Sequence, residues 1–189
     1  MQQQNHHFNS KRIRNMSKLM ISNTLDQAIL TELDKAPLTG YDLTKLLPIN
    51  TGWKASHQQI YRQCNKMAAE GVLEFTEVTN EGKPDSKLYR MTDVGKAALR
   101  EMVEGEQFKL QTFRNKATVM LAAGSASYFI SASEALSLAV NAISERLNEL
   151  RESIDSDNQV ESMNLELELG HKQADLDFAN RAKDLLCAK

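Results

Sequence analysis

The sequence has few of the features that mark exported, membrane-bound or metal-binding proteins. It has only two cysteines, Cys64 and Cys187, too few for a disulfide framework or a cysteine-based zinc site. No apolar run approaches the roughly 20 residues that a membrane span needs. The N-terminus also lacks the apolar segment and cleavage site of a secretory signal. We therefore expect a soluble, cytoplasmic protein with free thiols and no contact with membranes.

An excess of positive charge is also missing. The net charge of the 189 residues is −2, and residues 22–103 hold ten basic and eleven acidic side chains. A surface for nucleic acid must therefore come from how the charges are arranged. Residues 1–21 carry four basic and no acidic side chains, and we interpret them as a flexible tail. Contact of this tail with a DNA minor groove is the alternative.

The sequence shows no arrangement typical of catalysis. The histidines on predicted helices, His57 and His171, have no neighbouring pair of nucleophile and carboxylate in the sequence. The pair His6 and His7 lacks further metal ligands nearby. We expect no enzymatic activity, no metal and no cofactor.

The sequence does contain a strongly patterned stretch from Gly52 to Met91. Ser56 and Gln59 fit a capping box, which predicts the start of a helix. One face of this helix is apolar, with Ile60, Cys64 and Met67. The opposite face carries the side-chain types that read DNA base edges, namely Gln58, Arg62 and Asn65. An ordinary solvated helix face is the alternative interpretation.

A β-hairpin is predicted after this helix. Residues 72–78 and 86–91 have the β-branched and aromatic composition of strands. The connection between them is too long for a two-residue turn, so it should project as a wing. Two lysines, Lys83 and Lys87, are candidates for phosphate contacts there, and such contacts position a protein on DNA without reading its sequence.

Two further helices are predicted before this stretch. Apolar residues at helical spacing indicate a helix over 24–35, capped by Asn23 or its neighbour. Thr39 and Asp42 form a second capping box, and the helix that they start is expected to end at Pro48. Three helices followed by a hairpin is the order of a winged helix-turn-helix, whose third helix enters the major groove of DNA.

Together these motifs resemble a known family. The runs TGYDLTKLL, SHQQIYRQCNKMAAEGVL and EGKPDSKLYRMTDVGKAAL look like the N-terminal domain of PadR-family transcriptional regulators, over residues 22–103. WKASHQQIYR with EGKPD resembles the virulence activator alpha, or AphA-like, subgroup, whose members are dimeric DNA-binding regulators. The resemblance implies a recognition helix over 56–66, with Tyr61 at the family's near-constant tyrosine, and a wing over 82–87.

Beyond the hairpin, Thr92 is expected to cap a fourth helix with Val94, Ala98 and Met102 on one face and Leu99 beside them. Helical spacing resumes over 108–121, where Phe113, Ala117 and Met120 or Leu121 are candidate contacts. The segment GEQ between these helices marks the expected domain boundary. It divides the chain into a flexible basic tail (1–21), a winged-helix DNA-binding domain (22–104) and a helical dimerisation domain (105–189).

Two long helices are predicted at the C-terminal end. Apolar residues from Leu136 to Ile154 alternate spacings of four and three, which is typical of a coiled-coil seam. The last helix carries two apolar stripes and needs two packing surfaces. Because such a hairpin buries too little to be stable alone, we predict that two copies pair through it; an intramolecular bundle with helix 108–121 is the alternative. The predicted dimerisation residues are Leu136, Val140, Ile143, Leu147, Leu150, Ile154, Val160, Met163, Leu167 and Phe178.

The sequence thus predicts a mainly α protein with a small β-hairpin, made of an N-terminal winged helix-turn-helix and a C-terminal antiparallel helical dimerisation domain. The predicted function is a sequence-specific transcriptional regulator, a homodimer on a pseudo-palindromic operator in double-stranded DNA. A second transcription regulator alongside it is left open. The predicted DNA-contacting residues are Lys54, Ser56, Gln58, Gln59, Tyr61, Arg62, Asn65, Lys66, Lys83 and Lys87.

Two alternative functions belong to different classes. One is a sensor that binds an aromatic or amphiphilic small molecule at the dimer interface, with Trp53, Tyr128, Phe129 and Phe178 as candidate contacts. The other is a winged domain that binds protein rather than DNA, which the balanced charge of residues 22–103 permits.

Overall fold

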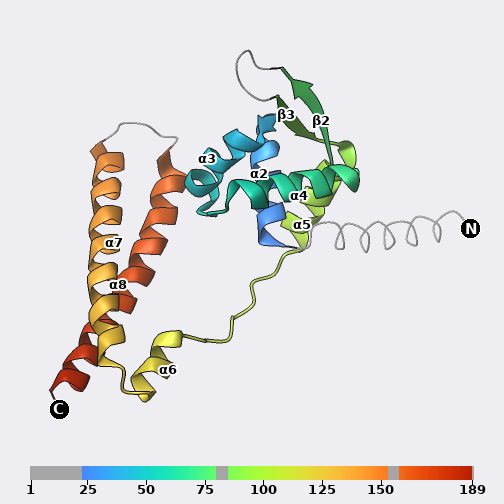
Figure 1. The fold of residues 1–189 in the computed structure, drawn as a ribbon. Helices are drawn as coiled ribbons and strands as arrows, with labels where there is room; N and C mark the ends of the chain where they lie inside the picture. Colours follow the sequence, from blue (N-terminus) through green and yellow to red (C-terminus); the bar gives the residue numbers. More distant parts are fainter. Residues whose placement is uncertain (1–22, 80–84, 153–157, 189) are drawn as a thin grey trace, which may run out of the picture. The chain divides into compact units, whose positions relative to one another are not determined.

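The chain divides into two compact units, Met1–Phe108 and Lys109–Lys189. The structure is a computed structural model and describes residues 23–79, 85–152 and 158–188 (Figure 1). Each unit has a buried apolar core of its own. Within the described ranges, no helix is long and apolar enough to cross a membrane.

The first unit begins with three helices, α2 (Thr24–Leu33), α3 (Gly40–Thr51) and α4 (His57–Ala69). Each starts at a polar residue whose side-chain oxygen accepts a hydrogen bond from an early backbone amide, as N-caps do. This confirms the predicted helices and both predicted capping boxes. The capping residues are Asn23, Thr39 with Asp42, and Ser56 with Gln59.

The prediction that α3 ends at Pro48 is wrong, because the helix continues to Thr51. A proline removes one amide donor and bends a helix, but neighbouring contacts can hold the next turn. Here Asn50 Nδ2 donates to the buried carboxylate of Glu32 at 2.7 Å, which ties this turn to α2. The helix ends at Gly52, whose φ of 67° lies in the left-handed region that glycine adopts without strain.

Three antiparallel strands form a sheet in the order β1-β3-β2. The hairpin strands β2 (Leu73–Val78) and β3 (Ser86–Met91) lie where the sequence predicts them, with Phe75 opposite Tyr89. The sequence did not predict β1 (Leu38–Thr39), since two residues are too few to show strand periodicity. Because β1 pairs with β3, it fixes the start of α3 beside the sheet.

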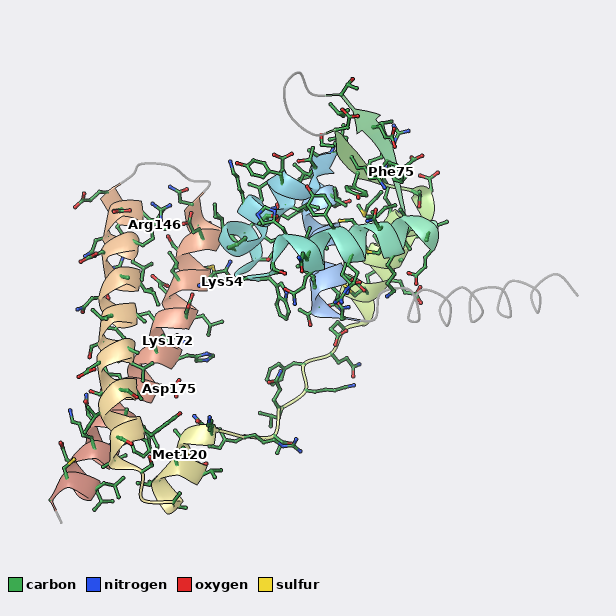
Figure 2. The ribbon with its side chains drawn as sticks, viewed as in Figure 1. Lys54, Phe75, Met120, Arg146, Lys172 and Asp175 are labelled. Atoms are coloured by element: carbon green, nitrogen blue, oxygen red, sulfur yellow. The ribbon has the colours of Figure 1, made fainter. Side chains whose placement is uncertain are left out.

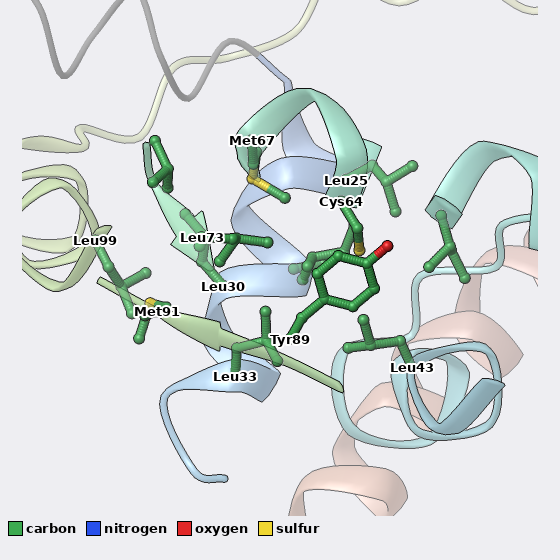
Figure 3. Close-up of a cluster of buried hydrophobic side chains, with 14 of the residues drawn as sticks. Leu25, Leu30, Leu33, Leu43, Cys64, Met67, Leu73, Tyr89, Met91 and Leu99 are labelled. Atoms are coloured by element: carbon green, nitrogen blue, oxygen red, sulfur yellow. The ribbon is translucent and has the colours of Figure 1, made fainter. Parts of the chain in front are cut away.

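The core of the first unit lies between the helices and this sheet (Figure 3). Ile60, Cys64 and Met67 of α4 are fully buried, which confirms the apolar face of that helix. Tyr89 of β3 is fully buried as well, and its ring lies among Cys64 and the leucines of α2 and α3 (Figure 3). The buried face of α4 therefore sets which of its residues point outward.

Helix α5 (Asp93–Gly105) starts at the predicted cap, Thr92, and packs through three of the four predicted residues, Ala98, Leu99 and Met102. Val94 is 54% exposed, so its predicted place on the packed face is wrong. The closest approach occurs at Gly95, where an added Cβ would lie 2.3 Å from the Val72 carbonyl oxygen. Gly95 therefore lies on the packed face together with Ala98, Leu99 and Met102.

The second unit consists of α6 (Lys116–Ala122), α7 (Ala126–Glu152) and α8 (Gln159–Cys187). Helices α7 and α8 form an antiparallel hairpin (Figure 1). Polar pairs join the two helices along their length: the Ser133 hydroxyl lies 2.6 Å from Asn180 Oδ1, and Arg146 lies 2.9 Å from Glu161.

The predicted helix over 108–121 is wrong in its first half, because residues 106–115 have no regular secondary structure. Phe108 and Phe113 are 90% and 80% exposed, so Phe113 makes no buried contact in this chain. An apolar periodicity yields a stable helix only where its face is buried. The helix that does form starts at Asn115, whose side chain caps it, and packs through Ala117, Met120 and Leu121.

Candidate nucleic-acid interface

The outward face of α4 presents two long polar side chains one turn apart. Gln58 and Arg62 are exposed, whereas Ile60 and Cys64 on the opposite side are fully buried. The amide of glutamine and the guanidinium of arginine match the hydrogen-bonding patterns of adenine and guanine in the major groove. Burial of the apolar face therefore leaves this pair facing solvent, where DNA could be reached.

Two of the predicted DNA contacts, Ser56 and Gln59, form the helix cap. Gln59 Oε1 accepts from the Ser56 amide at 2.9 Å and lies 3.0 Å from its hydroxyl. The Ser56 oxygen in turn accepts from the Gln59 amide at 3.3 Å. These side chains fix where α4 begins, and the Gln59 side-chain oxygen is used within the cap.

Asn65 and Lys87 meet at the junction of α4 and the hairpin. Asn65 Oδ1 accepts from the Tyr89 hydroxyl at 3.1 Å and from the Lys87 ammonium at 3.3 Å. Burial, with smaller contributions from Cys64 and Tyr61, raises the pKa of Tyr89 to about 12, so its hydroxyl keeps the proton that it donates. The structure thus joins two predicted DNA-contacting residues to each other.

The remaining predicted lysines lie in different surroundings. Lys66 Nζ is 3.7 Å from the fully buried carboxylate of Asp26 and 4.0 Å from Glu70, so acidic groups offset part of its charge. Lys54 is exposed in the connection between α3 and α4 (Figure 2). Lys83 lies outside the described residues.

Tyr61 packs against the start of α3. Its ring lies so close to Gly40 that a Cβ added there would be 2.5 Å from Tyr61 Cε1. The ring is half-buried. Glycine at position 40 therefore allows the two helices of the helix-turn-helix to approach at the tyrosine.

The sequence reasoning missed a group of side chains on α3 beside the start of α4. Thr44 Oγ1 donates to the Gly40 carbonyl at 2.8 Å and lies 3.3 Å from His57 Nδ1, within hydrogen-bond distance. The ring of Tyr41 stacks on His57, and Lys45 Nζ lies 4.3 Å from the centre of the Tyr41 ring. His57 is itself exposed at the start of α4. The spacing of residues 41, 44 and 45 on one helix face was the available signal.

A separate pocket of about 350 Å³ lies in the second unit. Its aromatic wall consists of Tyr128, Phe129 and Phe178, with Phe129 packed edge-to-face on both neighbours. Lys172 and Asp175 of α8 add polar groups to the lining (Figure 2). Four aromatic residues are predicted from the sequence to contact a small molecule. The fourth, Trp53, belongs to the first unit and does not line this pocket.

The predicted dimerisation residues lie in different surroundings. Val160, Met163 and Leu167 form a stripe on α8 that is 55–63% exposed. Leu147 and Leu150 are buried within a single chain, and Phe178 lines the pocket. Ile154 lies outside the described residues. The other predicted residues of α7, Leu136, Val140 and Ile143, are half-buried.

Residues 29–101 match the model of the transcriptional regulator PadR-like family. The chain carries a PadR-family domain. Over 109 residues it is 36% identical to the negative transcriptional regulator PadR of Bacillus subtilis, covering 57% of each chain. It is also 36% identical over 81 residues to a probable transcriptional regulator of Mycobacterium tuberculosis, covering 43% of that protein. The matched region thus spans about half the length of these curated relatives.

Solved structures are similar to this PadR-like chain over both of its units. The Vibrio cholerae virulence activator AphA is 28% identical, with a TM-score of 0.73 over 87% of this chain and 99% of that one. Bacillus subtilis PadR in complex with operator DNA gives a TM-score of 0.72 at 22% identity, over 89% of this chain and 99% of that one. The same PadR with p-coumaric acid gives 0.62 at 20% identity, over 87% and 98%. The winged-helix fold, the PadR-like domain and the AphA-like relationship are therefore confirmed.

Proposed function

We propose that this PadR-like chain is a sequence-specific DNA-binding transcriptional regulator. The observation that carries the proposal is the outward face of α4, where Gln58 and Arg62 stand exposed on a helix whose other face is buried. In a winged helix-turn-helix this is the helix that enters the major groove. The complex of Bacillus subtilis PadR with operator DNA supports the assignment through the shared fold.

Binding as a homodimer would place two copies of α4 in successive major grooves, about one helical turn apart on a pseudo-palindromic site. The exposed stripe of Val160, Met163 and Leu167 supports pairing between copies, because exposed contiguous apolar surface marks interaction sites. Arg62 and Gln58 would read bases. Lys54 and His57 would contact phosphates at the start of the helix.

The test is a fluorescence-anisotropy titration of the full chain against the DNA upstream of its own gene and against a scrambled duplex, at two salt concentrations. We expect binding to the native duplex at least about 10³ tighter, with log affinity falling linearly as log salt rises. Equal weak binding to native and to genome-wide selected duplexes would contradict the proposal. Retained binding of a protein partner under those conditions would instead favour the protein-binding alternative.

A second function is supported by the aromatic pocket of the second unit. Its volume of about 350 Å³ lies within the range of small-molecule sites. Three aromatic rings suit a flat apolar ligand, and the Lys172 ammonium suits an acidic substituent. The complex of Bacillus subtilis PadR with p-coumaric acid supports a ligand-responsive regulator of this kind.

Thermal shifts with aromatic acids and their uncharged amides test this second function. We expect the acids to raise the melting temperature of the wild-type chain, and Lys172→Gln to reduce the shift for acids but not for amides. Absence of any shift across such a panel would contradict a ligand site here, without bearing on DNA binding.

A further inference from the structure

Asn65 has little capacity left for reading an adenine. Its Oδ1 accepts from Tyr89 at 3.1 Å and from Lys87 at 3.3 Å, and an amide oxygen has two acceptor lone pairs. An asparagine that recognises adenine must accept from N6 with this oxygen while its NH₂ donates to N7. Tyr89 and Lys87 of β3 already occupy the acceptor half of that pattern.

The partners of Asn65 are held firmly by the sheet. Tyr89 is fully buried in the core (Figure 3). Phe75 lies opposite it in the strand register, with the ring centres 5.8 Å apart. The Lys87 ammonium lies 4.1 Å from the centre of the Phe75 ring, a distance that suits a cation–π contact. Figure 2 places Phe75 on the hairpin, so the amide oxygen of Asn65 on α4 contacts a part of the hairpin that other side chains also hold in place.

We propose that Asn65 is a positioning residue that fixes strand β3 and the Lys87 ammonium relative to the recognition helix α4, and that it does not read a base. This inference rests on the proposed DNA-binding function. The Lys87 ammonium then meets a phosphate at a position set by the Asn65–Tyr89–Lys87 contacts, while base reading is left to Gln58 and Arg62. This contact therefore adds the same affinity whichever base pair lies opposite Asn65.

Three variants separate positioning from base reading. Asn65→Leu removes the acceptor and the amide donors, whereas Asn65→Asp keeps the acceptor and removes only the donors. Tyr89→Phe removes a hydroxyl that is buried and cannot touch DNA. Asn65 is exposed and phenylalanine is nearly isosteric with tyrosine, so all three chains should fold.

The readout is the affinity for the operator and for each of its single-base variants. We expect Asn65→Leu and Tyr89→Phe to weaken operator binding by a similar factor, roughly five- to tenfold. The loss of affinity that each single-base change causes should be the same as for the wild-type chain. The slope of log affinity against log salt should become shallower by the equivalent of about one phosphate contact. In Asn65→Asp, each single-base change should also cause the same loss of affinity as in the wild-type chain, although the negative charge will lower the overall affinity.

Loss of discrimination at one A·T pair in Asn65→Leu and Asn65→Asp, with Tyr89→Phe binding like wild type, would overturn the inference and leave the proposed function intact. A double-mutant cycle of Asn65→Leu and Tyr89→Phe in chemical unfolding needs no DNA, and we expect its two effects to be non-additive. Additive effects would overturn the inference as well. Failure of the wild-type chain to prefer its native duplex would count against the proposed function instead.

Discussion

Two buried acids in the core of the winged unit make its stability sensitive to alkaline pH. Burial, aided by nearby Asp26, raises the pKa of the Cys64 thiol from 9.0 to about 12, and burial raises that of Tyr89 from 10.0 to about 12. Between about pH 9 and pH 12, the thiol and the phenol lose their protons in the unfolded chain but keep them in the folded chain. The free energy of unfolding should therefore fall as pH rises from about 9 towards 12.

Urea unfolding at neutral pH and at stepwise higher pH measures this effect. Cys187 is exposed, so Cys187→Ala serves as the control and should leave the pH profile unchanged. An unfolding midpoint that stays constant up to pH 11 would mean that the thiol and the phenol are not held protonated. We also expect a thiol reagent to modify Cys187 in the folded chain and Cys64 only after unfolding.

Arg62 is the residue on which base discrimination should depend most. Replacing it by alanine should cost about 1–3 kcal/mol of operator binding and relax preference at a single base pair. Lys54→Ala is the comparison, because an exposed lysine at a phosphate should weaken all duplexes alike and make the salt slope shallower. A uniform loss in Arg62→Ala would reassign this side chain to the phosphates.

At the scale of elements, the contact between α5 and Val72, the residue before β2, depends on a glycine. A Cβ at Gly95 would lie 2.3 Å from the Val72 carbonyl oxygen, so Gly95→Ala forces the helix away from the sheet. We expect a loss of about 1–3 kcal/mol in unfolding free energy, as for other overpacked sites.

Gly105→Ala in the same helix is the matched control. An added Cβ there meets nothing within 4 Å, so alanine should be neutral or stabilising by up to about 1 kcal/mol, following helix propensity. Chemical denaturation of both variants measures the difference. Equal stability of Gly95→Ala and Gly105→Ala would show that the sheet yields at Val72 without cost.

The elements that the sequence predicted well are those specified by local chemistry. Capping boxes at Thr39 and Ser56 set the helix starts within one turn. The β-branched and aromatic composition of the hairpin strands likewise predicts where they lie. The errors arise where distant contacts decide. A hydrogen bond from Asn50 to α2 carries α3 past Pro48, and pairing with β3 creates a strand of two residues at Leu38.

The candidate site was predictable to the same extent. Helical periodicity separated the outward residues Gln58 and Arg62 from the buried ones, as found. Periodicity could not show that Asn65 and Lys87 contact each other, since they are 22 residues apart and join two elements. It also could not show that Lys66 lies near Asp26 of α2.

At the scale of the whole molecule, the exposed stripe on α8 predicts self-association. Leu167 is 63% exposed, and Leu167→Glu should abolish pairing because a carboxylate cannot be buried there without a partner. We expect sedimentation to give twice 21.3 kDa for the wild-type chain and 21.3 kDa for the variant, with unchanged helical circular dichroism.

Gln173→Glu is the control for this prediction, since it adds the same charge to an exposed position about 120° away around α8. It should remain paired. A wild-type mass of 21.3 kDa at all micromolar concentrations would contradict self-association through α8. Pairing should also strengthen operator binding, because two linked recognition helices act at a high effective concentration.

The central position of β3 in the sheet sets an order of events during synthesis. Both β1 and β2 pair only with β3, so the sheet cannot close until Met91 has left the ribosome. The stripe on α8 is made at least 68 residues later, starting at Gln159. Domains fold as units with the N-terminal one first during translation. Each nascent chain therefore completes its winged unit before it has the surface with which to meet a second copy.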